Sequence, residues 1–96
     1  MATVSKTRAY HGTLTANTVD TVNLAHPGTY VYVLNRGSSD ISVRLDGTAP
    51  TFKGDESFIV PAGTARRFDT KVYQIAAVKL ISDTTGTPAY SVESIG

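Results

Sequence analysis

Ile41-Ser42-Val43-Arg44-Leu45, followed by Asp46-Gly47, alternates apolar and polar residues and then reaches a turn. Because the side chains of a β-strand point alternately to opposite faces, this pattern places the three aliphatic residues of the run on one buried face. Short apolar runs closed by Gly, Pro, Asp or Asn recur along the chain, as in 58–60 before the turn 61–63. The pattern predicts an all-β fold, a single antiparallel β-sandwich or jelly-roll-like barrel of seven to eight short strands.

Turn signals separate the expected strands at intervals of about 8 to 12 residues, as in sandwiches and small barrels. Residues 1–9 contain little that could be buried and are expected to form an extended N-terminal arm, whereas 10–96 form the sandwich domain. The run 30–34 is apolar at every position and is therefore expected to be a central strand covered on both sides. The expected strands are about 10–14, 21–24, 30–34, 41–45, 58–60, 66–68, 75–82 and 90–95.

Composition narrows the classes of function. The 96 residues carry a formal net charge of +1, so no strong field would attract nucleic acid or an anionic membrane. The chain has no Cys, which excludes disulfides, a thiolate nucleophile and the usual structural zinc sites. No apolar run approaches the roughly 18 residues that span a bilayer, and the N-terminus does not resemble a signal peptide. We expect synthesis in a cytoplasm, with no membrane partner.

Few residues could perform chemistry. Nucleophilic catalysis needs a base, and His11 and His26 are the only imidazoles; each is expected to be an exposed polar residue. Asp46, Asp55 and Glu56 could pair as acid and base or bind calcium, but their loop setting favours turn formation, and their spacing is not that of a calcium loop. The sequence therefore predicts no enzyme, no cofactor and no metal site.

Two groups of strand residues could bind a partner. Tyr30 and Tyr32 share one face of a strand; they are expected to form a buried or interface face, the alternative being a platform for sugar rings. Arg66 and Arg67 are adjacent, so alternation directs one of them away from the core. The outward arginine could bind a carboxylate on a partner, or it could simply place charge on a strand edge.

The N-terminal arm has two readings as well. Lys6 and Arg8 could belong to a frayed, solvated terminus, or the arm could add a strand to the sheet of a neighbouring subunit. We take Lys6, Arg8 and Tyr10, together with Arg66 and Arg67, as the candidate partner contacts.

Longer segments resemble a known group of proteins. The stretch 35–51, the turn Val60-Pro61-Ala62-Gly63, the Arg-containing strand 65–68 and the closing strands 78–82 and 90–93 are similar to segments of small virion proteins of tailed bacteriophages. The resemblance covers about residues 30 to 95 and consists mainly of structural elements.

The resemblance implies a noncatalytic structural protein of the virion, a capsid decoration or minor head protein located on the capsid surface. Its implied partners are the major capsid protein or other virion subunits, and association with further copies of itself, as a homo-oligomer, is a second possibility. The alternative is a tail-tip, fibre or carbohydrate-binding β-sandwich module on the virion surface.

Overall fold

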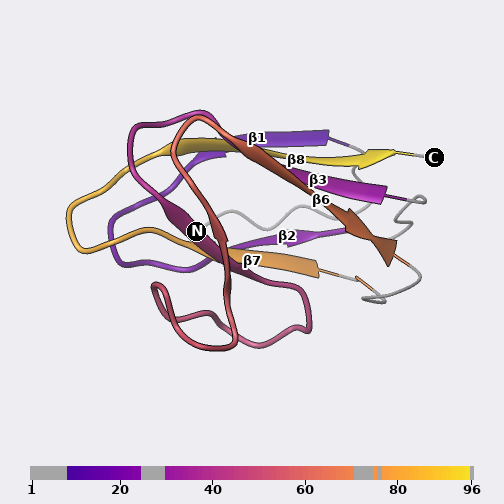
Figure 1. The fold of residues 1–96 in the computed structure, drawn as a ribbon, viewed down its shortest axis with the longest axis horizontal. Helices are drawn as coiled ribbons and strands as arrows, with labels where there is room; N and C mark the ends of the chain where they lie inside the picture. Colours follow the sequence, from indigo (N-terminus) through magenta and orange to yellow (C-terminus); the bar gives the residue numbers. More distant parts are fainter. Residues whose placement is uncertain (1–8, 25–29, 71–74, 76, 96) are drawn as a thin grey trace.

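The computed structural model describes residues 9–24, 30–70, 75 and 77–95. The described part forms eight β-strands arranged as two packed layers, which confirms the predicted all-β class (Figure 1). The strands are β1 (Ala9–Thr13), β2 (Asp20–Asn23), β3 (Tyr30–Asn35), β4 (Ile41–Arg44), β5 (Phe58–Val60), β6 (Ala65–Asp69), β7 (Ala77–Ile81) and β8 (Ala89–Ile95).

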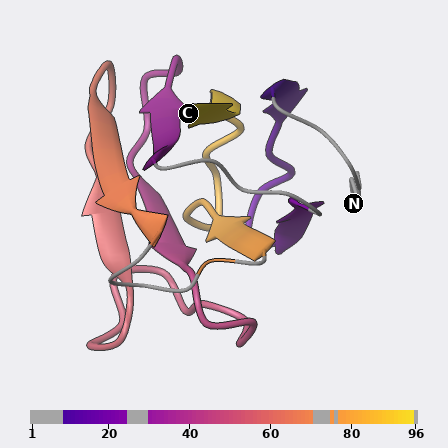
Figure 2. The ribbon, with the colours of Figure 1, turned by 90° about the vertical axis from the view of Figure 1, so that its right-hand side faces the viewer.

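The strands form two antiparallel four-stranded sheets. Sheet A has the order β1-β8-β3-β6, and sheet B has the order β2-β7-β4-β5. The chain crosses between the sheets at almost every connection, and the first and last strands pair with each other, as in a jelly roll. Figure 2, which is turned by 90° about the vertical axis from Figure 1, shows β1 and β8 above β2 and β7.

Alternate residues of each strand fill the space between the sheets. Val31 and Val33 of β3 in sheet A, and Val78 and Leu80 of β7 in sheet B, belong to this core, and all four are fully buried. Phe68 and Tyr90 are the largest buried side chains. The alternation predicted from 41–45 is therefore observed, since Ile41, Val43 and Leu45 are all core residues.

A buried polar contact joins β8 of sheet A to β2 of sheet B. The Tyr90 hydroxyl of β8 donates to Asp20 Oδ2 of β2 over 3.1 Å, and both residues are almost inaccessible to water. Burial is the main cause that raises the pKa of Tyr90 above its ordinary value, and the negative charge of Asp20 adds to it. Asp20 shares its strand face with Val22, so strand alternation directs this carboxylate inward.

Two turns are fixed by local chemistry. Asn35, which is buried at the end of β3, donates from Nδ2 to the carbonyls of Ser39 and Val60 and accepts from the Gly37 N–H, so it ties the β3–β4 turn to sheet B. The β5–β6 turn is closed by a bond from Thr64 N to Pro61 O, with Gly63 at φ 72°. A positive φ at that third turn position is what a type II turn requires of glycine.

The central strand differs from its prediction. β3 is buried only on alternate residues: Val31, Val33 and Asn35 face the core, whereas Tyr30, Tyr32 and Leu34 are half-buried on the outer face of sheet A. A two-layer sandwich covers each sheet on one side, so the second apolar face of β3 has no layer of this chain above it within the described residues.

Candidate interaction surface

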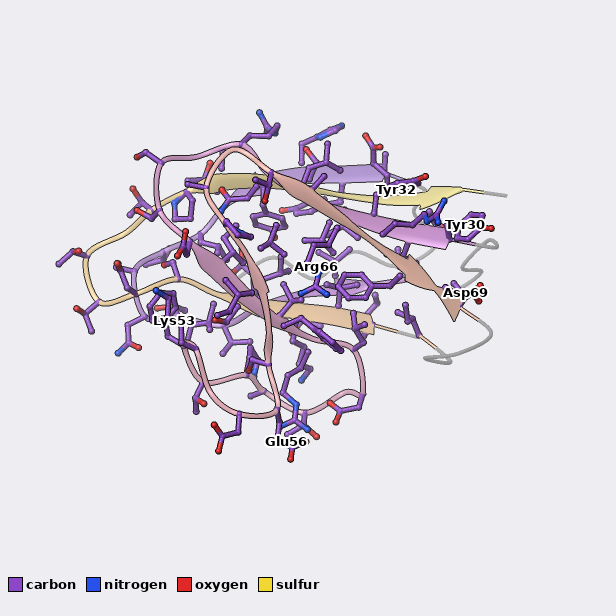
Figure 3. The ribbon with its side chains drawn as sticks, viewed as in Figure 1. Tyr30, Tyr32, Lys53, Glu56, Arg66 and Asp69 are labelled. Atoms are coloured by element: carbon purple, nitrogen blue, oxygen red, sulfur yellow. The ribbon has the colours of Figure 1, made fainter. Side chains whose placement is uncertain are left out.

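Part of the outer face of sheet B is covered by the chain itself. The loop 45–57 folds back on β4, where Lys53 N donates to Ser42 Oγ over 2.7 Å, and Ser42 is fully buried although it points away from the core. Lys53 adopts φ 54°, and its ammonium lies 3.3 Å from Asp40 Oδ2. Figure 3 shows Lys53 at the left and Glu56 at the bottom of the view, away from Tyr30 and Tyr32.

The outer face of sheet A carries a different set of side chains. Its central strand presents Tyr30, Tyr32 and Leu34, all half-buried, and strand registers place charged residues on either side of them. We call this surface the tyrosine face; its members are His11 of β1, Ser91 and Glu93 of β8, Tyr30, Tyr32 and Leu34 of β3, and Arg67 and Asp69 of β6.

Arg67 lies over the ring of Tyr30. Its guanidinium carbon is 4.6 Å from the centroid of the Tyr30 ring, within the range of a cation–π contact. Arg67 is exposed, and stacking on Tyr30 restricts the conformations of its long side chain before any partner binds. An ordered arginine beside tyrosines is the composition found at the energetically important centres of protein–protein interfaces.

Arg66 points the other way, as predicted for one of the two arginines. Its guanidinium carbon lies 5.1 Å from the Phe58 ring and 5.5 Å from the Phe68 ring, and Nη1 donates to Ile59 O over 3.3 Å. These contacts span from β6 to β5, at the side where the two sheets end (Figure 3). Arg66 therefore connects the edge strands of the two sheets within its own chain.

The other predicted contact residues are distributed as follows. Tyr10 points inward and packs against the core, with its ring centroid 6.0 Å from that of Tyr90. Ala9, placed in the predicted arm, is the first residue of β1 and pairs with Glu93. Lys6 and Arg8 lie outside the described residues, as does His26.

His11 makes a contact that the sequence did not reveal. Its Nδ1 lies 2.7 Å from Ser91 Oγ, and Arg36 Nε donates to the same oxygen over 2.9 Å. Ser91 is only 1% exposed. The third member of the cluster is the cation Arg36, bonded to the serine, whereas a catalytic triad has a carboxylate bonded to the histidine. The cluster connects the edge strand β1 and the β3–β4 turn to β8. The sequence could not predict this contact, because it depends on the β1–β8 register, which pairs His11 with Ser91.

A cavity of about 250 Å³ is lined by Arg44, Leu45, Asp46, Glu56 and Phe58. Arg44 donates through Nε and Nη2 to the two oxygens of Asp46, and this bond is the first cause that lowers the pKa of Asp46 to about 2. The Thr48 N–H lowers it further. Asp46 is thus an ionised turn carboxylate, as its loop setting predicted, and is not poised to donate a proton.

The described residues contain no group of three or more His, Asp or Glu side chains that could hold a metal ion. Nor does any helix among them have the length and hydropathy needed to cross a membrane.

No protein-family model and no curated protein matches the chain. Among solved structures it is similar to a de novo designed double-stranded β-helix determined by solution NMR, with 18% sequence identity and a TM-score of 0.59. The alignment covers 93% of this chain and 100% of the designed one. At this identity the likeness concerns the fold alone, and it supports the two-sheet β architecture.

Proposed function

We propose that this chain is a noncatalytic structural protein of a tailed-bacteriophage virion, a capsid decoration or minor head protein that binds the assembled shell and reinforces it. The observation that carries the proposal is the contrast between the two outer faces. In sheet B the loop 45–57 covers β4, whereas in sheet A no other described segment covers the half-buried row of tyrosines with its stacked arginine. The resemblance of residues 30 to 95 to small virion proteins supplies the biological setting.

The mechanism is mechanical. Specific protein interfaces bury about 800 Å² on each partner. The accessible surface of this chain is 5011 Å², so a single such contact would use roughly one sixth of it. Many weak contacts repeated over a lattice add up through avidity, and all of them must break before the shell opens. A rigid sandwich whose tyrosine face is buried against another virion subunit, either a capsid protein or a second copy of this chain, suits this task.

Two measurements test the proposal. Quantitative mass spectrometry of purified particles is expected to find the protein at high, fixed copy number, because a coat on a lattice occupies many equivalent positions. Purified protein is also expected to bind preformed shells at fixed stoichiometry and to raise the temperature at which they disrupt. Absence of the protein from purified particles would defeat the proposal.

The runner-up is a tail-tip, fibre or carbohydrate-binding module, and the half-exposed pair Tyr30 and Tyr32 is the observation in its favour. However, the guanidinium of Arg67 already occupies one face of the Tyr30 ring, where a sugar would stack. Glycan-array binding that is lost in Tyr32→Ala, with an unchanged circular dichroism spectrum, would favour this module over the shell protein. A copy number of only a few per particle would indicate a tail position.

A further inference from the structure

Two charged residues of the tyrosine face, Glu93 and Arg67, are arranged symmetrically about one side chain. Tyr32 of β3 is paired directly with Glu93 of β8 on one side and with Arg67 of β6 on the other. Neighbouring strands are about 4.8 Å apart, so the acid and the base are rooted at equal distances on opposite sides of Tyr32. Within the described residues, neither Glu93 nor Arg67 forms an ion pair.

This arrangement is complementary to itself. A two-fold axis that runs along β3 above Tyr32 turns a second copy face to face with the first and exchanges the two sides of the row. Arg67 of each copy then lies opposite Glu93 of the other, and the two Tyr32 side chains meet at the axis. We infer that the partner of the tyrosine face is a second copy of this chain, bound as an isologous dimer with two Arg67–Glu93 ion pairs.

The geometry tolerates the ordinary twist of packed sheets. Aligned sheets cross at about 30°, which displaces a residue one strand from the axis by about 2.5 Å, well within the reach of an arginine side chain. Along the axis, the half-buried stripe of Tyr30, Tyr32 and Leu34 packs on its own copy. Asp69, the last residue of β6, is paired with Tyr30 and therefore lies beside the end of the row, two residues along β6 from Arg67 (Figure 3).

The size of the face sets the expected affinity. Four strands of about five residues give a face of roughly 19 Å by 17 Å, or about 320 Å² on each copy, well below the roughly 800 Å² per partner of a standard interface. We therefore expect a dimer with a dissociation constant of about 10 to 100 μM, weakened by salt because both pairs are electrostatic. The inference rests on the proposed function only in treating the tyrosine face as a protein-binding surface.

Charge reversal tests the dimer. Arg67→Glu would place two glutamates opposite each other at both ion pairs, and Glu93→Arg would place two arginines there. Sedimentation equilibrium of the full chain at about 10 to 500 μM is expected to show at least about tenfold weaker association for each variant alone. An equimolar mixture of the two variants is expected to dimerise like the wild type, because both pairs are attractive again in the mixed dimer.

Matched controls apply the same charge changes elsewhere. Lys79→Glu lies on the outer side of sheet B, and Asp55→Arg lies on the loop that covers that sheet; neither is expected to alter association. Circular dichroism and thermal melts verify that every variant is folded. A wild-type chain that stays monomeric at about 500 μM, or a dimer indifferent to Arg67→Glu and Glu93→Arg, overturns the inference.

The same variants separate this inference from the proposed function. A monomeric wild-type chain that still binds shells would remove the dimer and leave the shell protein intact. A chain that dimerises with the expected charge-reversal pattern but is absent from purified particles would support the dimer and exclude the proposed function.

Discussion

Removing the Tyr90 hydroxyl tests whether the bond to Asp20 stabilises the sandwich. Tyr90→Phe keeps the buried ring and deletes the donor of the 3.1 Å bond to the Asp20 carboxylate. A buried hydrogen bond to a charged group contributes about 1.5 to 3 kcal/mol. Because Asp20 keeps other interactions in the fold, the expected loss is about 2 kcal/mol, and for a domain of this size the melting temperature should fall by roughly 8 to 16 °C.

Equilibrium urea unfolding measures this loss directly. The midpoint is expected to decrease while the slope stays unchanged, because the variant buries the same surface. Tyr32→Phe is the matched control: its side chain is half-buried on the outer face, and at a few micromolar protein we expect a change below about 0.5 kcal/mol. A loss below about 0.5 kcal/mol in Tyr90→Phe as well would refute a stabilising role for the buried bond.

The pH dependence provides an independent check on the same group. The pKa of Tyr90 is raised in the folded state, mainly by burial, so the unfolded chain ionises first as the pH rises. The contribution of the protonated Tyr90 to the free energy of unfolding is complete below pH about 10. Above that pH it decreases by up to about 1.4 kcal/mol per pH unit. The stability difference between wild type and Tyr90→Phe should therefore shrink between pH 10 and 11. A constant difference across this range would contradict the assignment.

Three further predictions concern packing, acid stability and a turn. Gly37→Ala should cost about 1 to 3 kcal/mol in urea unfolding, because an added Cβ would lie 2.5 Å from the Cα of Pro88. The pKa of Asp46 is lowered to about 2, so its stabilisation is present above pH about 4 and lost as the pH falls toward 2. Asp46→Asn should flatten that acid limb in a pH series of thermal melts. Gly63→Val should lower the melting temperature by several degrees, since φ 72° is strained for a β-branched residue.

Much of the fold follows from alternation alone. Ile41, Val43 and Leu45 are core residues, and Val60 is buried before its turn, because a period of two leaves a strand only one face to bury. The strand order was not available from this pattern. Pairing β1 with β8, about 80 residues later, depends on how the two sheets close around the core.

The candidate site was predictable only in part. Alternation correctly required Arg66 and Arg67 to point to opposite faces, but the stacking of Arg67 on Tyr30 depends on the register of β3 with β6. Glu93 was not selected, since nothing local distinguishes it from any other strand carboxylate. Asp20 could have been found, because it precedes Val22 and Leu24 at steps of two and therefore faces the core with them.

In the inner strands β4 and β3, a polar residue on the outer face is buried whereas apolar residues on the outer face are partly exposed. β4 presents the polar Ser42 outward, yet Ser42 is buried, because a hydroxyl can accept the Lys53 N–H of the covering loop. β3 presents Tyr30 and Tyr32 outward, and no described segment of the chain covers them fully. A strand that is apolar at every position is typical of two-sided burial, and the sandwich provides only one side. In the dimer that we propose, the second copy supplies the other, so the apolar run 30–34 is explained by the assembly rather than by the fold of one chain.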